Sequence, residues 1–128
     1  MPTRITRDID IRVDSTYEPV HSDPNMNQYV FSYRIKIQNH SSEAVQLLSR
    51  HWYIFDSNGQ YKEVKGEGVI GIQPIIPAGE SHEYKSYSNL KTDIGMMWGT
   101  YLMKKIHNDQ LFEAQIPEFQ LITPNRLN

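Results

Sequence analysis

Apolar and polar side chains alternate with a period of two residues through much of the chain. The alternation is clearest from Tyr29 to Asn39, where every second side chain up to Ile37 is apolar and most of those between are polar. Successive side chains of a β-strand point to opposite faces, so this pattern predicts a strand with one face in a core. Residues 9–13, 81–88, 96–103 and 111–122 predict further strands. No segment keeps the spacing of an amphipathic helix for long, so the pattern favours an all-β fold.

Residues 45–55 differ because they are apolar at both alternating positions, which predicts a central strand covered on both faces. Trp52 lies in this strand and is predicted to belong to the core. The strand ends at Asp56-Ser57-Asn58-Gly59, and the Asn58-Gly59 pair is typical of a tight hairpin turn with positive φ angles. The chain is therefore expected to return as a strand over residues 60–64.

Residues 66–77 carry three glycines followed by two prolines, a composition that disfavours a regular helix and predicts a constrained loop. The whole pattern gives about seven to nine short antiparallel strands separated by Gly, Pro and Asn turns. At this length the count favours a β-sandwich over a barrel. Residues 1–128 are predicted to form a single domain.

Composition adds mainly exclusions. The 128 residues include 13 Lys and Arg against 15 Asp and Glu, a formal net charge of −2, and both halves of the chain are close to neutral. This balance disfavours a nucleic-acid binder. With no cysteine, thiolate metal sites and disulfides are excluded. The longest apolar runs are far shorter than a membrane-spanning helix, so no membrane insertion and a cytoplasmic location are expected.

Gly66, Gly68 and Gly71 match the spacing G-x-G-x-x-G of dinucleotide-binding loops, but prolines follow where that motif needs a helix. Two interpretations remain. The glycines serve the backbone by allowing positive φ or close packing, which we expect above all at Gly68. Alternatively, their amides form an anion site for pyrophosphate or a nucleotide, with Arg50 and Lys65 as side-chain partners.

Other candidate chemistry is weak. There is no nucleophile motif, and the five histidines are scattered along the chain. Glu80 and His82 would share a strand face, but nothing in the spacing supplies a third metal ligand. Residues 56–59 superficially resemble a calcium loop, yet Lys65 stands where the loop needs a glutamate. We therefore expect no catalytic residue, no metal site and no cofactor.

Five segments, in order, resemble the ApaG family: residues 50–59, 64–74, 84–86, 95–103 and 116–121. The resemblance extends over roughly residues 5–122, and several separated motifs in the right order make it specific. It implies a fibronectin type III-like or immunoglobulin-like sandwich. It also implies an association with cobalt and magnesium efflux, a gene position often near a dinucleoside tetraphosphate hydrolase, and related domains in F-box and polymerase-interacting proteins.

None of these implications supplies a catalytic residue. The recurrence of the domain inside larger interaction proteins favours a non-enzymatic binding module that recognises a protein partner or a phosphorylated small molecule. Two alternatives stay open: an accessory protein in cobalt and magnesium homeostasis, and a nucleotide hydrolase. A homodimer through exposed sheet edges is a further expectation.

Overall fold

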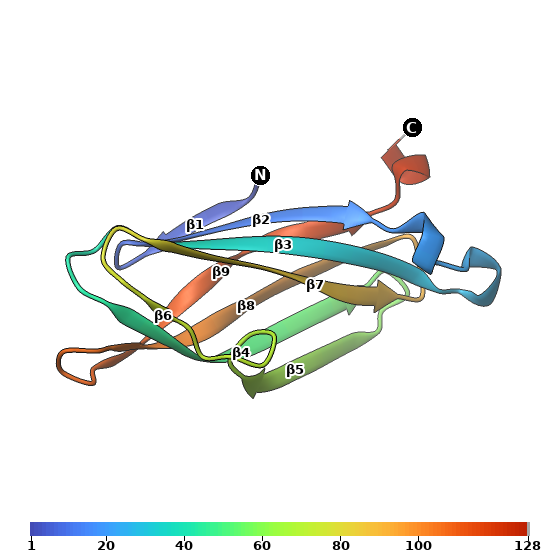
Figure 1. Cartoon of the computed structure of the whole chain (residues 1–128). Coiled ribbons are helices and arrows are strands. Elements are labelled where there is room, and N and C mark those ends of the chain that lie inside the picture. The colour runs from blue at the N-terminus through green and yellow to red at the C-terminus, as the bar shows by residue number, and fades with distance from the viewer. Residues whose placement is uncertain (128) are drawn as a thin grey trace.

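The period-two pattern corresponds to long antiparallel strands. The computed structural model describes residues 1–127, which form nine strands and three short 3₁₀ turns (Figure 1). The strands are β1 (Thr3–Thr6), β2 (Ile9–Tyr17), β3 (Tyr29–Asn39), β4 (Val45–Asp56), β5 (Tyr61–Glu67), β6 (Ile75–Ile76), β7 (Ser81–Leu90), β8 (Ile94–Lys105) and β9 (Leu111–Ile122). The 3₁₀ turns are η1 (Pro19–His21), η2 (Pro24–Met26) and η3 (Pro124–Leu127).

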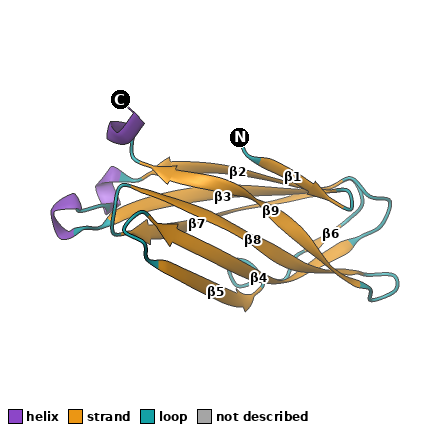
Figure 2. Ribbon diagram, turned by 180° about the vertical axis from the view of Figure 1, so that it is seen from behind, coloured by secondary structure: helices purple, strands orange, loops and turns teal. Residues whose placement is uncertain are grey.

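The strands form two antiparallel sheets that face each other, as Figure 2 shows from behind. One sheet has the order β1-β2-β3-β7. The other has the order β5-β4-β8-β9, with the short β6 paired to β4. The predicted all-β antiparallel sandwich is confirmed, with a strand count at the upper end of the expected range. The fibronectin type III-like or immunoglobulin-like character stays a prediction.

The core lies between the sheets and is built from the side chains that the alternation placed inward. Phe31, Tyr33, Ile35 and Ile37 of β3 are all buried, and Trp52 of β4 is only 2% exposed. The rings of Tyr33 and Trp52 meet across the interface with centroids 5.4 Å apart and planes at 62°. Edge-to-face contacts of this kind add to the stabilisation from burial alone. The prediction that Trp52 belongs to the core is confirmed.

The prediction that β4 is covered on both faces is wrong, and a β-bulge explains the misleading pattern. The register between β4 and β8 shifts between Leu47 and Ser49. A bulge adds one residue to one strand, so the side chains that follow it point to the opposite face from the one the alternation would give. Val45 and Leu47 therefore point inward before the bulge, whereas Trp52 and Ile54 point inward after it. The apolar residues that precede the bulge and those at the other alternating positions after it thus serve one covered face, whereas Tyr53 and Phe55 point outward.

The β4–β5 hairpin is present, but its turn differs from the prediction. Gly59 has a φ of +90°, whereas Asn58 is not among the residues with positive φ. The amide of Gly59 donates to the Asp56 carbonyl at 2.9 Å, and the Asp56 amide donates to the Gln60 carbonyl at 2.9 Å. A longer loop with a single left-handed glycine therefore closes the hairpin in place of a two-residue turn.

The two sides of the sandwich are closed to different degrees. On one side the sheets are joined by hydrogen bonds, because the Gln115 amide of β9 donates to Thr6 Oγ1 of β1 at 3.2 Å and Ser15 Oγ of β2 donates to the Gln120 carbonyl at 3.1 Å. On the other side lie the edge strands β5 and β7. Within residues 1–127 no hydrogen bond joins β5 to β7, so this side is the open one. No helical segment of the described chain has the length and apolar character needed to cross a bilayer.

Candidate functional site

The glycine-rich loop starts where β5 ends, and Gly68 fixes its course. The amide of Gly68 donates to the Leu48 carbonyl at 2.8 Å, and its φ is +60°. A β-carbon at this position would collide with the backbone carbonyl of Ile72. Gly68 therefore needs both a left-handed backbone and the absence of a side chain, which confirms the structural prediction for this residue.

A tight turn follows directly. Val69 and Ile72 form an isolated bridge in which the Val69 amide donates to the Ile72 carbonyl at 2.8 Å and the Ile72 amide donates back at 3.1 Å. The two central residues, Ile70 and Gly71, have φ angles of 47° and 77°. Two consecutive positive φ values are typical of the type I′ turn. A β-branched residue seldom adopts this conformation, so Ile70 stores backbone strain at an exposed tip.

Arg50 lies against this loop, as the anion-site hypothesis expected, but its side chain is engaged by the protein itself. Nη1 donates to the carbonyls of Glu67 and Gly68, each at 2.9 Å. Gly66 lies opposite Arg50 in the β4–β5 register, and a β-carbon there would stand 2.8 Å from the guanidinium nitrogens. Gly66 thus gives the Arg50 side chain the room to reach the end of β5.

Lys65 lies on the other face of the strand. It is opposite His51 in the register, and residues directly opposite in an antiparallel pair share a face. The Arg50 side chain points to the same inward face as Trp52, whereas the Lys65 side chain points to the same outward face as His51. The structure therefore brings Arg50 together with the glycines and places Lys65 on the opposite face of the sheet. The anion site at Gly66, Gly68 and Gly71 stays a prediction.

A cluster of phenols lies inward of Arg50. Tyr84 of β7 and Tyr101 of β8 share a short hydrogen bond between their hydroxyl groups. Burial raises the pKa of Tyr101 well above its ordinary value and also raises the pKa of Tyr84 and Tyr33, while the charge of Arg50 acts in the opposite direction on all three. Desolvation disfavours the phenolate, so these hydroxyl groups stay protonated, and the bond between Tyr84 and Tyr101 joins the two sheets.

The outer face of the second sheet carries aromatic side chains of its own. We give the name outer aromatic face to six residues on this side of the sheet: His51, Tyr53, Phe55, Tyr61, Met96 and Trp98. The rings of Tyr53 and Trp98 stack with centroids 5.7 Å apart and planes at 7°. Tyr61 lies 6.1 Å from the Tyr53 ring and is 52% exposed, and Phe55 is 39% exposed. Contiguous exposed aromatic side chains of this kind are enriched at binding surfaces.

Polar contacts fix one side of this face. His51 Nε2 lies 3.0 Å from Glu63 Oε2, and the Tyr61 hydroxyl donates to Glu63 Oε1 at 3.1 Å. These two hydrogen bonds, with that from His51 the larger influence, hold the pKa of the Glu63 carboxyl below its ordinary value. Stabilising the carboxylate keeps a negative charge beside the rings. The His51 ring also stacks on Tyr53 at 4.4 Å, so the face is ordered in the free protein.

Sequence reasoning missed the outer aromatic face because it assigned both apolar parities of β4 to the core. One signal was available in the sequence. Tyr53 has the parity opposite to Trp52, and Trp98 has the parity opposite to Met97 and Tyr101. Two large aromatic residues that point away from the core on adjacent strands can stack on each other at the surface.

The described chain offers little metal chemistry. Among residues 1–127 no three His, Asp or Glu side chains lie together where they could hold a metal ion. The sequence departs from a calcium loop at residues 56–59, and here Asp56 instead accepts hydrogen bonds from the Lys91 amide at 2.6 Å and from the Thr92 hydroxyl. This carboxylate joins the end of β4 to the β7–β8 turn.

The geometry thus describes a small antiparallel β-sandwich with an exposed aromatic face and an open edge, a class of domain that commonly presents surfaces to partners. The family model of the ApaG domain matches residues 19–105. The chain is 45% identical over 126 residues to Protein ApaG of Brucella canis, covering 98% of this chain and 96% of the relative. It is likewise 45% identical over 120 residues to Protein ApaG of Sinorhizobium fredii, covering 94% and 92%.

Two solved structures show the same fold at substantial sequence identity. The crystal structure of a Bordetella pertussis protein described as ApaA superposes with a TM-score of 0.88 at 42% identity and covers 96% of both chains. A second X-ray structure gives a TM-score of 0.89 at 37% identity over 98% of this chain and 94% of the other. The chain belongs to the ApaG family.

Proposed function

We propose that residues 1–128 act as one non-enzymatic binding module in the cytoplasm, and that the outer aromatic face docks a protein partner. The observation that carries the proposal is the stack of Tyr53 and Trp98, extended by the exposed ring of Tyr61. Aromatic side chains that are already ordered bury a large area on binding and lose little conformational freedom.

The charges around this face favour a partner of stated chemistry. Glu63 and Glu67 share the outward parity of β5, and Glu113 lies opposite Leu102 on the outward parity of β9. Lys65 and Lys104 oppose them, which leaves acidic groups in excess. A segment that carries arginine beside apolar side chains would match this surface, because guanidinium groups pair with carboxylates and stack on aromatic rings.

The test is a set of matched variants. Tyr53→Ala and Trp98→Ala remove the stack, whereas Tyr87→Ala removes a tyrosine of the other sheet that is 54% exposed. We expect a protein captured by the native chain to be lost with the first two variants and kept with the third. The purified partner should then bind the native chain at least roughly tenfold more tightly than Trp98→Ala, as expected when an aromatic anchor is truncated.

Two results would contradict the proposal. Equal loss of the captured protein with Tyr87→Ala would show that the contact is not confined to the outer aromatic face. Unchanged affinity of the purified partner for Trp98→Ala would show that the stack is not an anchor. Circular dichroism of each variant serves as the control for folding.

The phosphorylated small molecule at the glycine loop is the second proposal. It is supported by Gly71, whose φ is +77° and whose amide makes no hydrogen bond within the described chain. The expected result is movement of the Gly66, Gly68 and Gly71 amide signals when pyrophosphate is added at low salt. Lys65→Gln should leave these shifts unchanged because Lys65 lies on the opposite face of the sheet, and Arg50→Ala would also release the end of β5.

The remaining alternatives have less support in residues 1–127. No described geometry favours direct cobalt or magnesium binding or nucleotide hydrolysis. Self-association through the edges of β5 and β7 stays a prediction, and the alternating Lys and Glu residues of β5 oppose indiscriminate edge pairing.

A further inference from the structure

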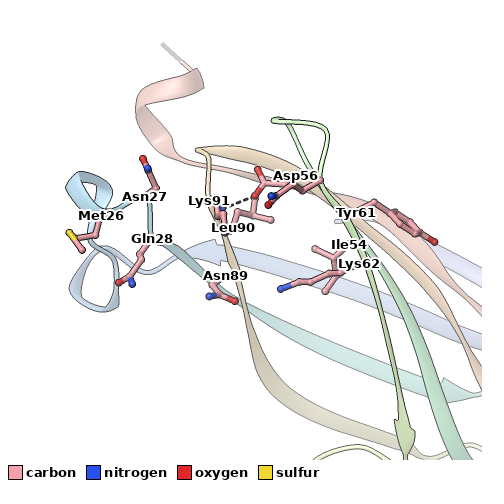
Figure 3. Close-up of a pocket in the computed structure, with 11 residues that line it drawn as sticks. Met26, Asn27, Gln28, Ile54, Asp56, Tyr61, Lys62, Asn89, Leu90 and Lys91 are labelled. Carbon is pink, nitrogen blue, oxygen red and sulfur yellow. Dashed lines mark hydrogen bonds between the residues drawn. The ribbon is translucent and has the colours of Figure 1, made fainter.

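A cleft of about 830 Å³ opens on the side of the sandwich where β5 and β7 face each other (Figure 3). Three separate parts of the chain line it: the η2 turn with the residues that follow it, the β4–β5 hairpin, and the end of β7 with the turn after it. Its volume lies within the range of roughly 300–1,000 Å³ that small-molecule sites occupy.

The lining combines an apolar floor with a polar rim. Ile54 and Leu90 form the floor and are only 6% and 3% exposed. The polar side chains around them are two lysines and four carboxamides: Asn27, Gln28, Gln60, Lys62, Asn89 and Lys91. An apolar floor with a few convergent polar groups is the usual composition of a ligand site.

The charge of the rim is positive. Within the described chain neither Lys62 nor Lys91 has a carboxylate within ion-pair distance. Asp56 is the one acidic residue of the lining, and it is buried. Both of its oxygens already accept hydrogen bonds, from the Lys91 amide and the Thr92 hydroxyl, so it contributes to holding the rim in place. The two ammonium groups are therefore available to an anion.

The register of β5 places Lys62 at the cleft. Lys62 lies opposite Ile54, and both share the inward parity, whereas Lys65 lies opposite His51 on the outward parity. In Figure 3 the Lys62 side chain extends from β5 toward Asn89 on β7 and so enters the opening between the two sheets. Its aliphatic part covers the apolar floor while its ammonium group faces the polar rim.

We propose that this cleft binds a small organic anion, with its phosphate or carboxylate at Lys62 and Lys91 and its apolar ring on Ile54 and Leu90. Charge-assisted hydrogen bonds from the lysines select the anion, and the carboxamide side chains of the rim accept or donate to polar substituents. The cleft shares Tyr61 with the outer aromatic face, but its two lysines and its apolar floor belong neither to the Tyr53–Trp98 stack nor to the glycine loop, so the proposal does not depend on either proposal above.

The experiment follows amide chemical shifts during titration with phenyl phosphate, benzoate, adenosine monophosphate and inorganic phosphate. Signals of Asn89, Leu90 and Lys91 are expected to move, and those of Gly66 to Gly71 to stay. Phenyl phosphate should bind at least roughly fivefold more tightly than inorganic phosphate, because the ring removes apolar surface from water. Benzoate against phenyl phosphate tells which anionic group the lysines prefer.

Lys62→Gln and Lys65→Gln form the matched pair, because they remove the same charge from opposite faces of one strand. Lys62→Gln should weaken phenyl phosphate binding roughly tenfold, the usual scale of a lost charge-assisted hydrogen bond. Lys65→Gln should change it by less than about twofold, since an exposed charge on the far face is screened. Both positions are exposed, so both variants should fold.

Three outcomes would overturn the proposal. The first is equal weakening by the two variants, which would indicate a general charge effect. The second is movement of the Gly66 to Gly71 amides alone, which would locate binding at the glycine loop. The third is no shift with any probe at millimolar concentration and low salt.

Discussion

Trp52 and Trp98 lie on neighbouring strands one register position apart, yet they occupy opposite environments. Trp52 is paired with Gly99, and Trp98 is paired with Tyr53. Trp52 points between the sheets, where its ring meets Tyr101 and Phe119 edge-on at 6.4 and 5.9 Å. Trp98 points to the outside and lies flat on Tyr53.

The two faces of this sheet can therefore serve different purposes, one stability and the other recognition. Inside, perpendicular rings interlock with those of the facing sheet, and a change in one ring disturbs several elements. Outside, Tyr53 and Trp98 stack on each other and on neighbours of the same face, His51 and Tyr61, so none of these rings interlocks with the facing sheet. A substitution on the inner face should therefore act on folding, and one on the outer face should act on binding.

Trp52→Ala should lower the stability of the fold more than any other substitution considered. Removing a buried aromatic ring leaves a cavity that the surrounding strands fill only in part, so the free energy of unfolding should fall by roughly 3–5 kcal/mol. Urea denaturation followed by circular dichroism measures the loss. If Trp52→Ala does not fold, Trp52→Phe should fold with a smaller loss of about 1–2 kcal/mol. A Trp52→Ala variant as stable as the native chain would contradict the core assignment.

The contrast between inside and outside extends to two glycines of the loop. Gly68 is buried and Gly71 is exposed, although both have positive φ. Gly68→Ala should cost about 1–3 kcal/mol, because backbone strain adds to a collision with the Ile72 carbonyl. Gly71→Ala meets open space and should cost about 1 kcal/mol from strain alone. Equal melting temperatures of the two variants would argue against the close packing at Gly68.

Trp98→Ala should have a modest effect on folding. The substitution removes the half-buried Trp98 ring and its stacking contact with Tyr53, which should lower the free energy of unfolding by about 1 kcal/mol. The same denaturation experiment used for Trp52→Ala gives the comparison directly. A loss as large as that of Trp52→Ala would mean that the outer aromatic face also supports the fold.

Ionisation of tyrosine separates the interior from the surface without changing any core residue. Burial raises the pKa of Tyr33, Tyr84 and Tyr101, so these phenols should stay protonated above pH of about 10, where free tyrosine titrates. Their contribution to stability is present below the pKa of the unfolded chain and is lost as the pH rises toward the pKa of the folded state. Absorbance of tyrosinate should show them ionising only as the chain unfolds. Reversible ionisation of all eight tyrosines in the folded chain would contradict this.

Fluorescence quenching perturbs the molecule least. In Trp98→Phe the remaining Trp52 should be poorly quenched by acrylamide, because its side chain is 2% exposed. In Trp52→Phe the remaining Trp98 should be quenched more efficiently, since one face of its ring is reachable from solvent. Efficient quenching of Trp52 would defeat its core assignment.

The sequence was most informative where the alternation is uninterrupted. Along β3 the polar and apolar positions lead directly to a strand with a buried face, and Gly68 was identified because only glycine tolerates its conformation. The bulges were not predictable from the sequence. The extra residue at Leu48 carries no local signal, and it moves the inward-facing positions from odd to even residue numbers, so the strand reads as one continuous apolar run. The register shift at Pro117 and Glu118 of β9, opposite Trp98, has the same effect.

Sites formed by segments distant in the chain could not be predicted from the sequence for a different physical reason. Arg50 was rightly placed near the glycines, yet whether its guanidinium meets an anion or the carbonyls of Glu67 and Gly68 depends on the path of the backbone. The cleft needs three segments that come together only when the sandwich closes. The opposite faces of Lys62 and Lys65 follow from strand parity once the hairpin is assigned, so that part was within reach of the sequence.

The closed side of the sandwich also governs how the molecule can be attached to other things. Figures 1 and 2 both show the N-terminus beside β1 and the C-terminal end beyond β9 on the side away from β5. A chain tethered to a bead, a sensor surface or a fused neighbour through either end therefore holds β5 outward. The open cleft beside β5 then lies on the side away from the support, so ligand binding at this edge can be measured on immobilised protein.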